Sequence, residues 1–92
     1  MDTITESSGN VFADLGFSAE ESALLAMRAE LMARLRETIA ERGWTQTEAA
    51  SHLGIGQSRV SDLVRGKWEK FSLAMLVTLA TRAGRKVAVA IA

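Results

Sequence analysis

One stretch in the middle of the chain limits the possible folds most narrowly. Residues 46–66 read QTEAASHLGIGQSRVSDLVRG, which predicts two short helices on either side of a tight turn. Ala50 is the small side chain that would let the two helices approach closely. Leu53 ends the first helix on its buried side, and Gly54 takes the turn position that requires a positive φ.

The second helix, over residues 57–65, has matching apolar anchors. Ile55, Val60 and Leu63 are spaced to lie together beneath it. Two short helices with this turn and this buried set form the helix-turn-helix pattern, in which the second helix enters the major groove of DNA.

The polar residues that the pattern leaves outside carry groups that suit DNA, an interpretation that we favour over an ordinary solvated helix face. Gln57 can pair with adenine and Arg59 with guanine, while a serine is short enough to approach a base edge or a phosphate. Basic groups after the second helix, and an amide at the N-terminus of the first, suit phosphates. The candidate DNA-binding residues are Gln46, Gln57, Ser58, Arg59, Ser61, Arg65, Lys67 and Lys70.

Two further helices flank this motif. Ser18 and Glu21 fit a capping box that opens a helix ending near residue 42, and a fourth helix is expected over residues 73–83. The long helix has an apolar stripe and four arginines on what we expect to be a mostly solvated face. The stripe is Leu24, Leu31, Leu35 and Ile39, widened by Leu25 and Met32, and the arginines are Arg28, Arg34, Arg36 and Arg42.

The two ends of the chain are expected to behave differently. Residues 1–10 are polar and predict a flexible tail, followed by a single domain over residues 11–92. The apolar patch NVFADLGF at residues 10–17 either packs over the core, which we favour, or docks another protein. Residues 86–92 alternate in period two and predict a short strand. That strand must pair with the NVF segment, with its copy in a second subunit, or with a partner's sheet.

Composition excludes several classes of protein. The 92 residues include no cysteine and one histidine, which excludes a disulfide scaffold, a zinc–thiolate site and a multi-histidine metal site. No catalytic constellation is present, so we expect no enzyme activity, no cofactor and no metal. No run reaches the roughly 18 apolar residues of a membrane span, and no signal peptide is evident, so a cytoplasmic protein is expected.

Charge is unevenly distributed along the chain. The net charge is zero, but residues 1–23 hold five acidic groups and no basic one. Residues 24–92 therefore carry eleven basic and six acidic groups, a net charge of +5. Such asymmetry is typical of a protein that binds a polyanion or a partner. Charge alone is equally compatible with an ordinary solvated surface.

The chain resembles the lambda-repressor/Cro-like (XRE) class and, within it, HigA-type antitoxins. The resemblance rests on NVFADLGF, RAELMARLRETI, WTQTEAASHLGI, QSRVSDLVRGK, FSLAMLVTLA and the β-like tail. Gly56 departs from the common pattern, in which a bulkier polar residue precedes the second helix, and Trp68 has no place in it. The fold expected is mainly α, a lambda-repressor-like helix-turn-helix domain of four to five helices with a short C-terminal β-strand.

The resemblance implies a homodimer that represses transcription from a palindromic operator in its own promoter and neutralises a RelE/HigB-like ribonuclease toxin. Such a protein would be cytoplasmic and nucleoid-associated when bound to DNA. Two alternatives stay open: a stand-alone XRE-type transcriptional regulator without a toxin, and a protein-binding module whose helix-turn-helix no longer binds DNA. The acidic N-terminal region and the C-terminal strand are the two candidate toxin contacts.

Overall fold

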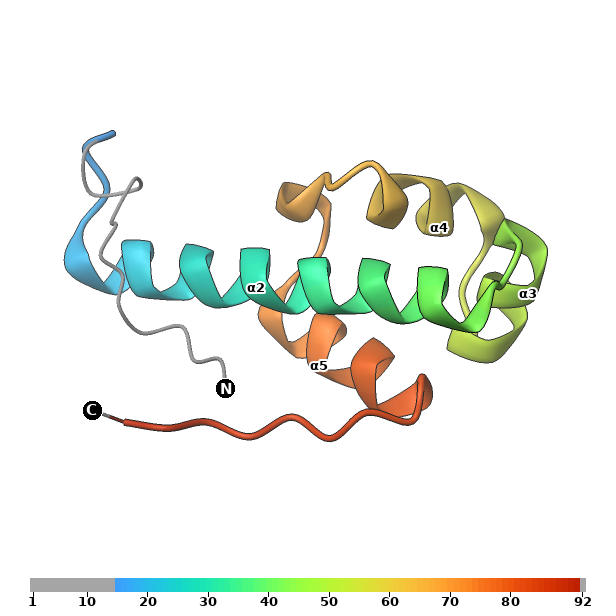
Figure 1. Cartoon of the computed structure of the whole chain (residues 1–92). Helices are drawn as coiled ribbons and strands as arrows, with labels where there is room; N and C mark the ends of the chain where they lie inside the picture. The colour runs from blue at the N-terminus through green and yellow to red at the C-terminus, as the bar shows by residue number, and fades with distance from the viewer. Residues whose placement is uncertain (1–14, 92) are drawn as a thin grey trace.

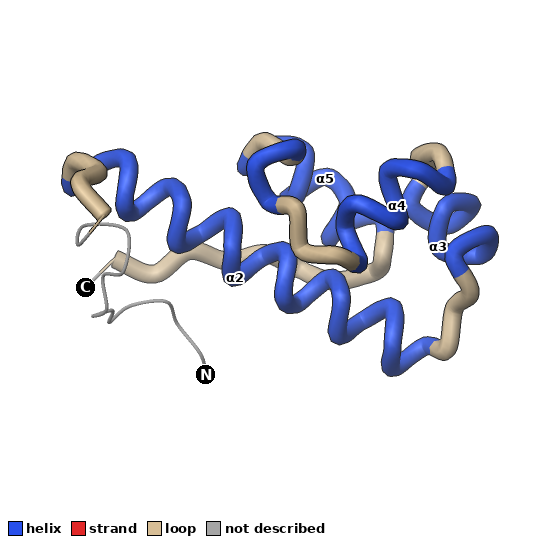
Figure 2. The backbone as a smooth tube through the Cα atoms, turned by 90° about the horizontal axis from the view of Figure 1, so that it is seen from above, coloured by secondary structure: helices blue, strands red, loops and turns tan. Residues whose placement is uncertain are grey.

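A computed structural model describes residues 15–91, whose regular elements are all helical (Figures 1 and 2). Helix α2 runs the length of the molecule, and the shorter helices gather along its C-terminal part, so that the first turns of α2 project beyond them. The elements in chain order are α2 (Ala19–Arg42), α3 (Gln46–Leu53), α4 (Gln57–Val64), the 3-10 turn η2 (Trp68–Lys70) and α5 (Leu73–Arg82).

Local sequence signals set the helix ends. In the capping box of α2, Glu21 N–H donates to Ser18 Oγ at 3.1 Å, and Ser18 N–H donates to Glu21 Oε1 at 3.0 Å. A second capping box, of Thr45 and Glu48, opens α3 in the same way. Helix α3 ends at Gly54, whose φ of 71° is the left-handed conformation expected from the sequence.

The core lies between α2 and the shorter helices. Leu53, Val60 and Leu63 are fully buried, as predicted for the helix-turn-helix. Phe71, which the sequence analysis did not single out, is 1% exposed and belongs to the same cluster. The complete cluster is Met32, Leu35, Ile39, Ala49, Leu53, Val60, Leu63, Phe71, Leu76, Leu79, Ala80 and Ala83.

Two predicted packing positions are wrong by one residue. Leu24 is 50% exposed, whereas Leu25 is 7% exposed, because the first turns of α2 project beyond the other helices and only one side of them is covered. In α3 the fully buried small residue is Ala49, and Ala50 is half-buried at the edge of the core. Both errors are rotations of one position on a helix, so the element itself was placed correctly.

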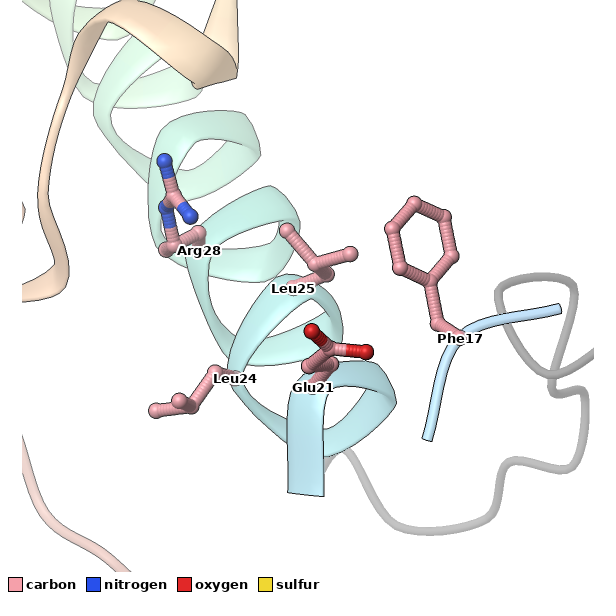
Figure 3. A pocket seen from close by; sticks show the side chains of 5 residues that line it. All are labelled: Phe17, Glu21, Leu24, Leu25 and Arg28. Atoms are coloured by element: carbon pink, nitrogen blue, oxygen red, sulfur yellow. The ribbon is translucent and has the colours of Figure 1, made fainter. Parts of the chain in front are cut away.

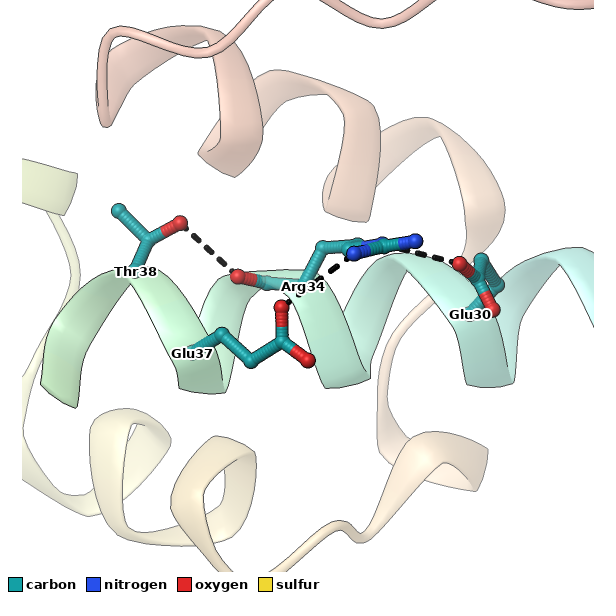
Figure 4. Close-up of polar contacts among 4 residues, drawn as sticks. All are labelled: Glu30, Arg34, Glu37 and Thr38. Carbon is teal, nitrogen blue, oxygen red and sulfur yellow. Dashed lines mark hydrogen bonds and ion pairs between the residues drawn. The ribbon is translucent and has the colours of Figure 1, made fainter. Parts of the chain in front are cut away.

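The arginines of α2 divide between the solvent and the fold. Arg34 lies on the solvated side, where its Nε donates to Glu30 at 2.9 Å and its Nη1 to Glu37 at 3.4 Å (Figure 4). Arg28 departs from the prediction of a mostly solvated face. Its Nε donates to the carbonyl of Phe71 at 3.0 Å and its Nη2 to that of Trp68 at 3.3 Å.

The predicted C-terminal strand is not formed among the described residues. Residues 85–91 run as an extended segment without strand hydrogen bonds among the residues described (Figure 2). An extended chain becomes a strand only when a neighbour satisfies its backbone N–H and C=O groups, and no described segment lies in that position. Residues 1–14, which include the predicted flexible tail and the NVF segment, and residue 92 lie outside the described residues.

The apolar patch at residues 10–17 does not pack over the core where the structure describes it. Leu15 is 70% exposed and Phe17 is 39% exposed. None of the helices described is long and apolar enough to cross a membrane.

Candidate nucleic-acid interface

The buried side of α4 determines which of its residues face outward. Val60 and Leu63 point into the core, so the opposite side of this short helix presents Ser58, Ser61 and Arg65. Ser58 and Arg65 are exposed and Ser61 is half-buried. Three of the predicted DNA-binding residues therefore share one outward face.

The N-termini of α3 and α4 are joined by a side-chain hydrogen bond. Gln57 Nε2 donates to Thr47 Oγ1 at 2.9 Å, and both residues are exposed. This bond uses one of the two amide hydrogens, so Oε1 and the second hydrogen stay available to an adenine. The sequence analysis placed Gln57 correctly but missed Thr47. The preference of short polar residues for the first turn of a helix was the one signal for it.

Helix α4 differs from its neighbours in how it begins. Ser18, Thr45 and Ser72 accept a backbone hydrogen bond at the starts of α2, α3 and α5, whereas Gly56 at the start of α4 has no side chain to do so. The first N–H groups of α4 therefore lack a side-chain cap and carry the positive end of the helix dipole. Because Gly56 stands where the family pattern has a bulkier polar residue, the first backbone N–H groups of α4 have no side-chain acceptor at its N-terminal end.

Arg59 lies apart from the outward face. Its guanidinium carbon is 4.7 Å from the centre of the Phe71 ring, and its Nε is buried without a hydrogen-bond partner. Stacking on Phe71 holds Arg59 at the flank of α4, toward η2. A contact with guanine, as predicted, would therefore use the Nη groups of an arginine that is already anchored in the fold.

The segment after α4 is held to α2. Lys67 N–H donates to Asp62 O at 3.0 Å, and Arg28 binds the carbonyls of Trp68 and Phe71 from the other side. The Arg28 guanidinium also lies 5.4 Å from the centre of the Trp68 ring. Trp68, which had no place in the family pattern, is thus a half-buried residue that anchors η2.

The predicted phosphate-binding residues lie along the border of this surface. Gln46 is exposed in the first turn of α3, Lys70 is exposed in η2, and Lys67 is half-buried between α4 and η2. Gln46 therefore lies toward the N-terminal end of α4, whereas Arg65, Lys67 and Lys70 lie at and beyond its C-terminal end. The predicted residues are thus spread along the length of α4, with Arg59 at its flank.

A family model described as a helix-turn-helix domain matches residues 11–92. The chain belongs to the helix-turn-helix domain family. The match spans nearly the whole chain and agrees with the arrangement of α3 and α4. No curated protein matches the chain.

Among the described residues, this helix-turn-helix domain carries a further aromatic cluster where α2 meets α3. The rings of Trp44 and His52 stack with their centres 4.1 Å apart and 9° between their planes. The guanidinium carbon of Arg42 also lies over the Trp44 ring, 5.4 Å from its centre. The cluster closes the junction of α2 and α3.

Proposed function

We propose that this helix-turn-helix domain is a sequence-specific transcriptional repressor that inserts the N-terminal end of α4 into the major groove. The observation that carries the proposal is the open end of α4, where Gln57, oriented by Thr47, stands beside backbone N–H groups without a side-chain cap. Base edges in the major groove offer the acceptors and donors that this end of α4 matches.

The residues around α4 divide into two roles. Gln57, Ser58 and Ser61 contact base edges and so determine which sequence is bound. The bordering groups contact phosphates and so determine how tightly any DNA is bound. This second set is Gln46, Arg65, Lys67 and Lys70.

A dimer on a palindromic operator follows from the size of α4. An eight-residue helix is about 12 Å long and reaches few base pairs. Two copies related by a two-fold axis would place two such helices about 34–36 Å apart on successive major-groove turns and double the sequence that is read.

The antitoxin role extends the proposal to a protein partner. Its support is the resemblance of the flanking segments to HigA-type antitoxins and the acidic composition of residues 1–23, which suits a basic RelE/HigB-like ribonuclease. In this role the chain acts in the cytoplasm by binding alone and carries out no reaction itself.

Two experiments test these parts separately. The DNA-binding part is tested by footprinting the full chain on the DNA upstream of its own gene. Protection of two half-sites about one helical turn apart is expected, and uniform protection would contradict the repressor. The antitoxin part is tested by co-expressing the protein of the neighbouring gene. Relief of its growth arrest and co-purification are expected, and failure of both would leave a stand-alone regulator.

A further inference from the structure

The exposed apolar side chains of the described residues gather at one end of the molecule. The C-terminal segment returns beneath α2 to the helix's N-terminal end, as Figures 1 and 2 both show. Within residues 15–91, the large hydrophobic residues left exposed include Leu24 on α2, and Val89 and Ile91 on the C-terminal segment. Leu15 and Phe17 are also exposed, on the stretch before α2 that lies on the other side of this helix (Figure 1). Such a grouping marks an interaction surface, whereas single exposed apolar residues do not.

After Arg85, the backbone of the C-terminal segment has no hydrogen-bond partner among the described residues. The last backbone hydrogen bond runs from Arg85 N–H to Ala80 O at 2.9 Å, and none is formed by residues 86–91 with any described residue. Val87 packs against the core, whereas Val89 is 68% and Ile91 93% exposed. An extended segment with alternating apolar residues and unpaired backbone groups is ready to pair with another strand.

We propose that a second copy of this chain occupies this surface, with residues 86–91 of the two copies paired as an antiparallel two-stranded ribbon. This inference rests on the dimer of the proposed function and names its interface. Antiparallel pairing of identical segments about a two-fold axis is self-complementary, because each contact occurs twice. Such pairing would complete the strand that the sequence predicts and that residues 15–91 of one chain do not form.

Charge favours a second copy over another partner. The extended segment starts with Arg85 and Lys86 and ends near the start of α2, where Glu20 and Glu21 are exposed. Antiparallel pairing about a two-fold axis at residue 88 or 89 brings the first residues of one segment to the last residues of the other. The basic pair of each copy then lies beside the acidic pair of its partner.

The position of the ribbon is compatible with DNA binding. The extended segment lies across α2 and α5 from α4, so pairing there leaves the recognition helix uncovered (Figure 1). Leu24 projects from α2 away from Phe17 and Leu25 (Figure 3). In the proposed dimer, the apolar side chains of Val89 and Ile91 would pack against the exposed Leu24.

Sedimentation equilibrium of the full chain without DNA is the first test. The wild type is expected to be a dimer, and Val89→Asp is expected to weaken dimerisation by about tenfold or more, because a buried apolar side chain is lost twice per dimer. Ala90→Asp is the matched control, since it adds the same charge on the other face of the segment. Val89 is exposed in the single chain, so its replacement leaves the fold intact, which circular dichroism verifies.

Single cysteines provide a second, geometric test in a chain that has no cysteine of its own. Introduced one at a time at positions 87–91, they are expected to form a disulfide between copies efficiently at one position, the one at the two-fold axis. A disulfide needs Cα atoms about 4.4–6.8 Å apart. A position two residues away from the two-fold axis lies about 13 Å from the same position in the other copy, which is too far for a disulfide.

Three results would overturn the inference: a monomeric wild type, a dimer unaffected by Val89→Asp, or a dimer without a cross-linking maximum at one position. The test is separate from that of DNA binding. Gln57→Ala is expected to reduce operator selectivity and leave the dimer intact. Val89→Asp is expected to leave selectivity for a half-site and remove the dimer. Strand pairing with a different protein would appear as a monomer without cross-linking and would therefore count against the proposal.

Discussion

Replacing Gly56 by aspartate is expected to stabilise the fold and to impair DNA binding. Gly56 has φ −76° and ψ 162°, which any residue adopts, and a Cβ there would meet no atom within 4 Å. Aspartate would cap the open N–H groups of α4 and place a negative charge at the positive end of the helix dipole. The gain in the free energy of unfolding is about 0.5–1 kcal/mol, which raises the melting temperature by roughly 2–8 °C.

The same cap removes donors that the proposed complex uses. Loss of a hydrogen bond between a backbone N–H and an acceptor on the DNA, together with repulsion by phosphates, costs about 1.5–3 kcal/mol, or roughly 10–100-fold in affinity. Calorimetry measures the first effect and fluorescence anisotropy with operator DNA the second. Gly56→Ser is the control, because it supplies a cap without a charge and is expected to lower affinity only by a few fold. Operator affinity equal to that of the wild type in a stabilised Gly56→Asp protein would refute the argument.

Four further substitutions test the packing and the site. Leu63→Ala leaves a cavity in a fully buried position and is expected to lower the free energy of unfolding by about 2–5 kcal/mol in a urea titration. Gly54→Ala strains a left-handed residue and crowds Arg82 Nη1, which would lie 3.1 Å from the new Cβ, so a loss of about 1–3 kcal/mol is expected, and an unchanged melting temperature would contradict it. Arg59→Met removes the charge stacked on the Phe71 ring and is expected to cost about 0.5–2 kcal/mol of stability even without DNA. Thr47→Val frees the Gln57 amide and is expected to weaken operator binding a few fold. In the background of Gln57→Ala it is expected to have no effect, and additive losses would contradict that coupling.

Local chemistry made much of the fold predictable. The capping boxes at Ser18 and Thr45 act within four residues, and the glycine at 54 is selected by its own φ, so the starts of α2 and α3 and the end of α3 could be placed from sequence. The burial of Val60 and Leu63 followed in the same way, because their spacing defines one side of a short helix.

What the sequence could not predict depends on groups distant in the chain. Leu24 and Leu25 differ in burial only because α2 projects beyond its neighbours. The hydrogen bond from Arg28 to the carbonyl of Phe71 joins residues 43 positions apart, and the stacking of Arg59 depends on Phe71, which lies beyond α4. The strand at residues 86–92 was predicted from an alternation that is necessary for a strand but not sufficient, since pairing also needs a neighbour.

Fluorescence anisotropy with Gln57→Ala tests the central claim, that α4 reads DNA, most directly. The wild type would be titrated against DNA from its own promoter and against a shuffled sequence over a salt series, with Thr78→Ala on the exposed side of α5 as control. The account predicts selective binding that weakens steeply with salt, a loss of about 1–3 kcal/mol on the promoter DNA for Gln57→Ala, and no change for the control. Equal binding to both DNAs by the wild type, unaffected by Gln57→Ala, would contradict it.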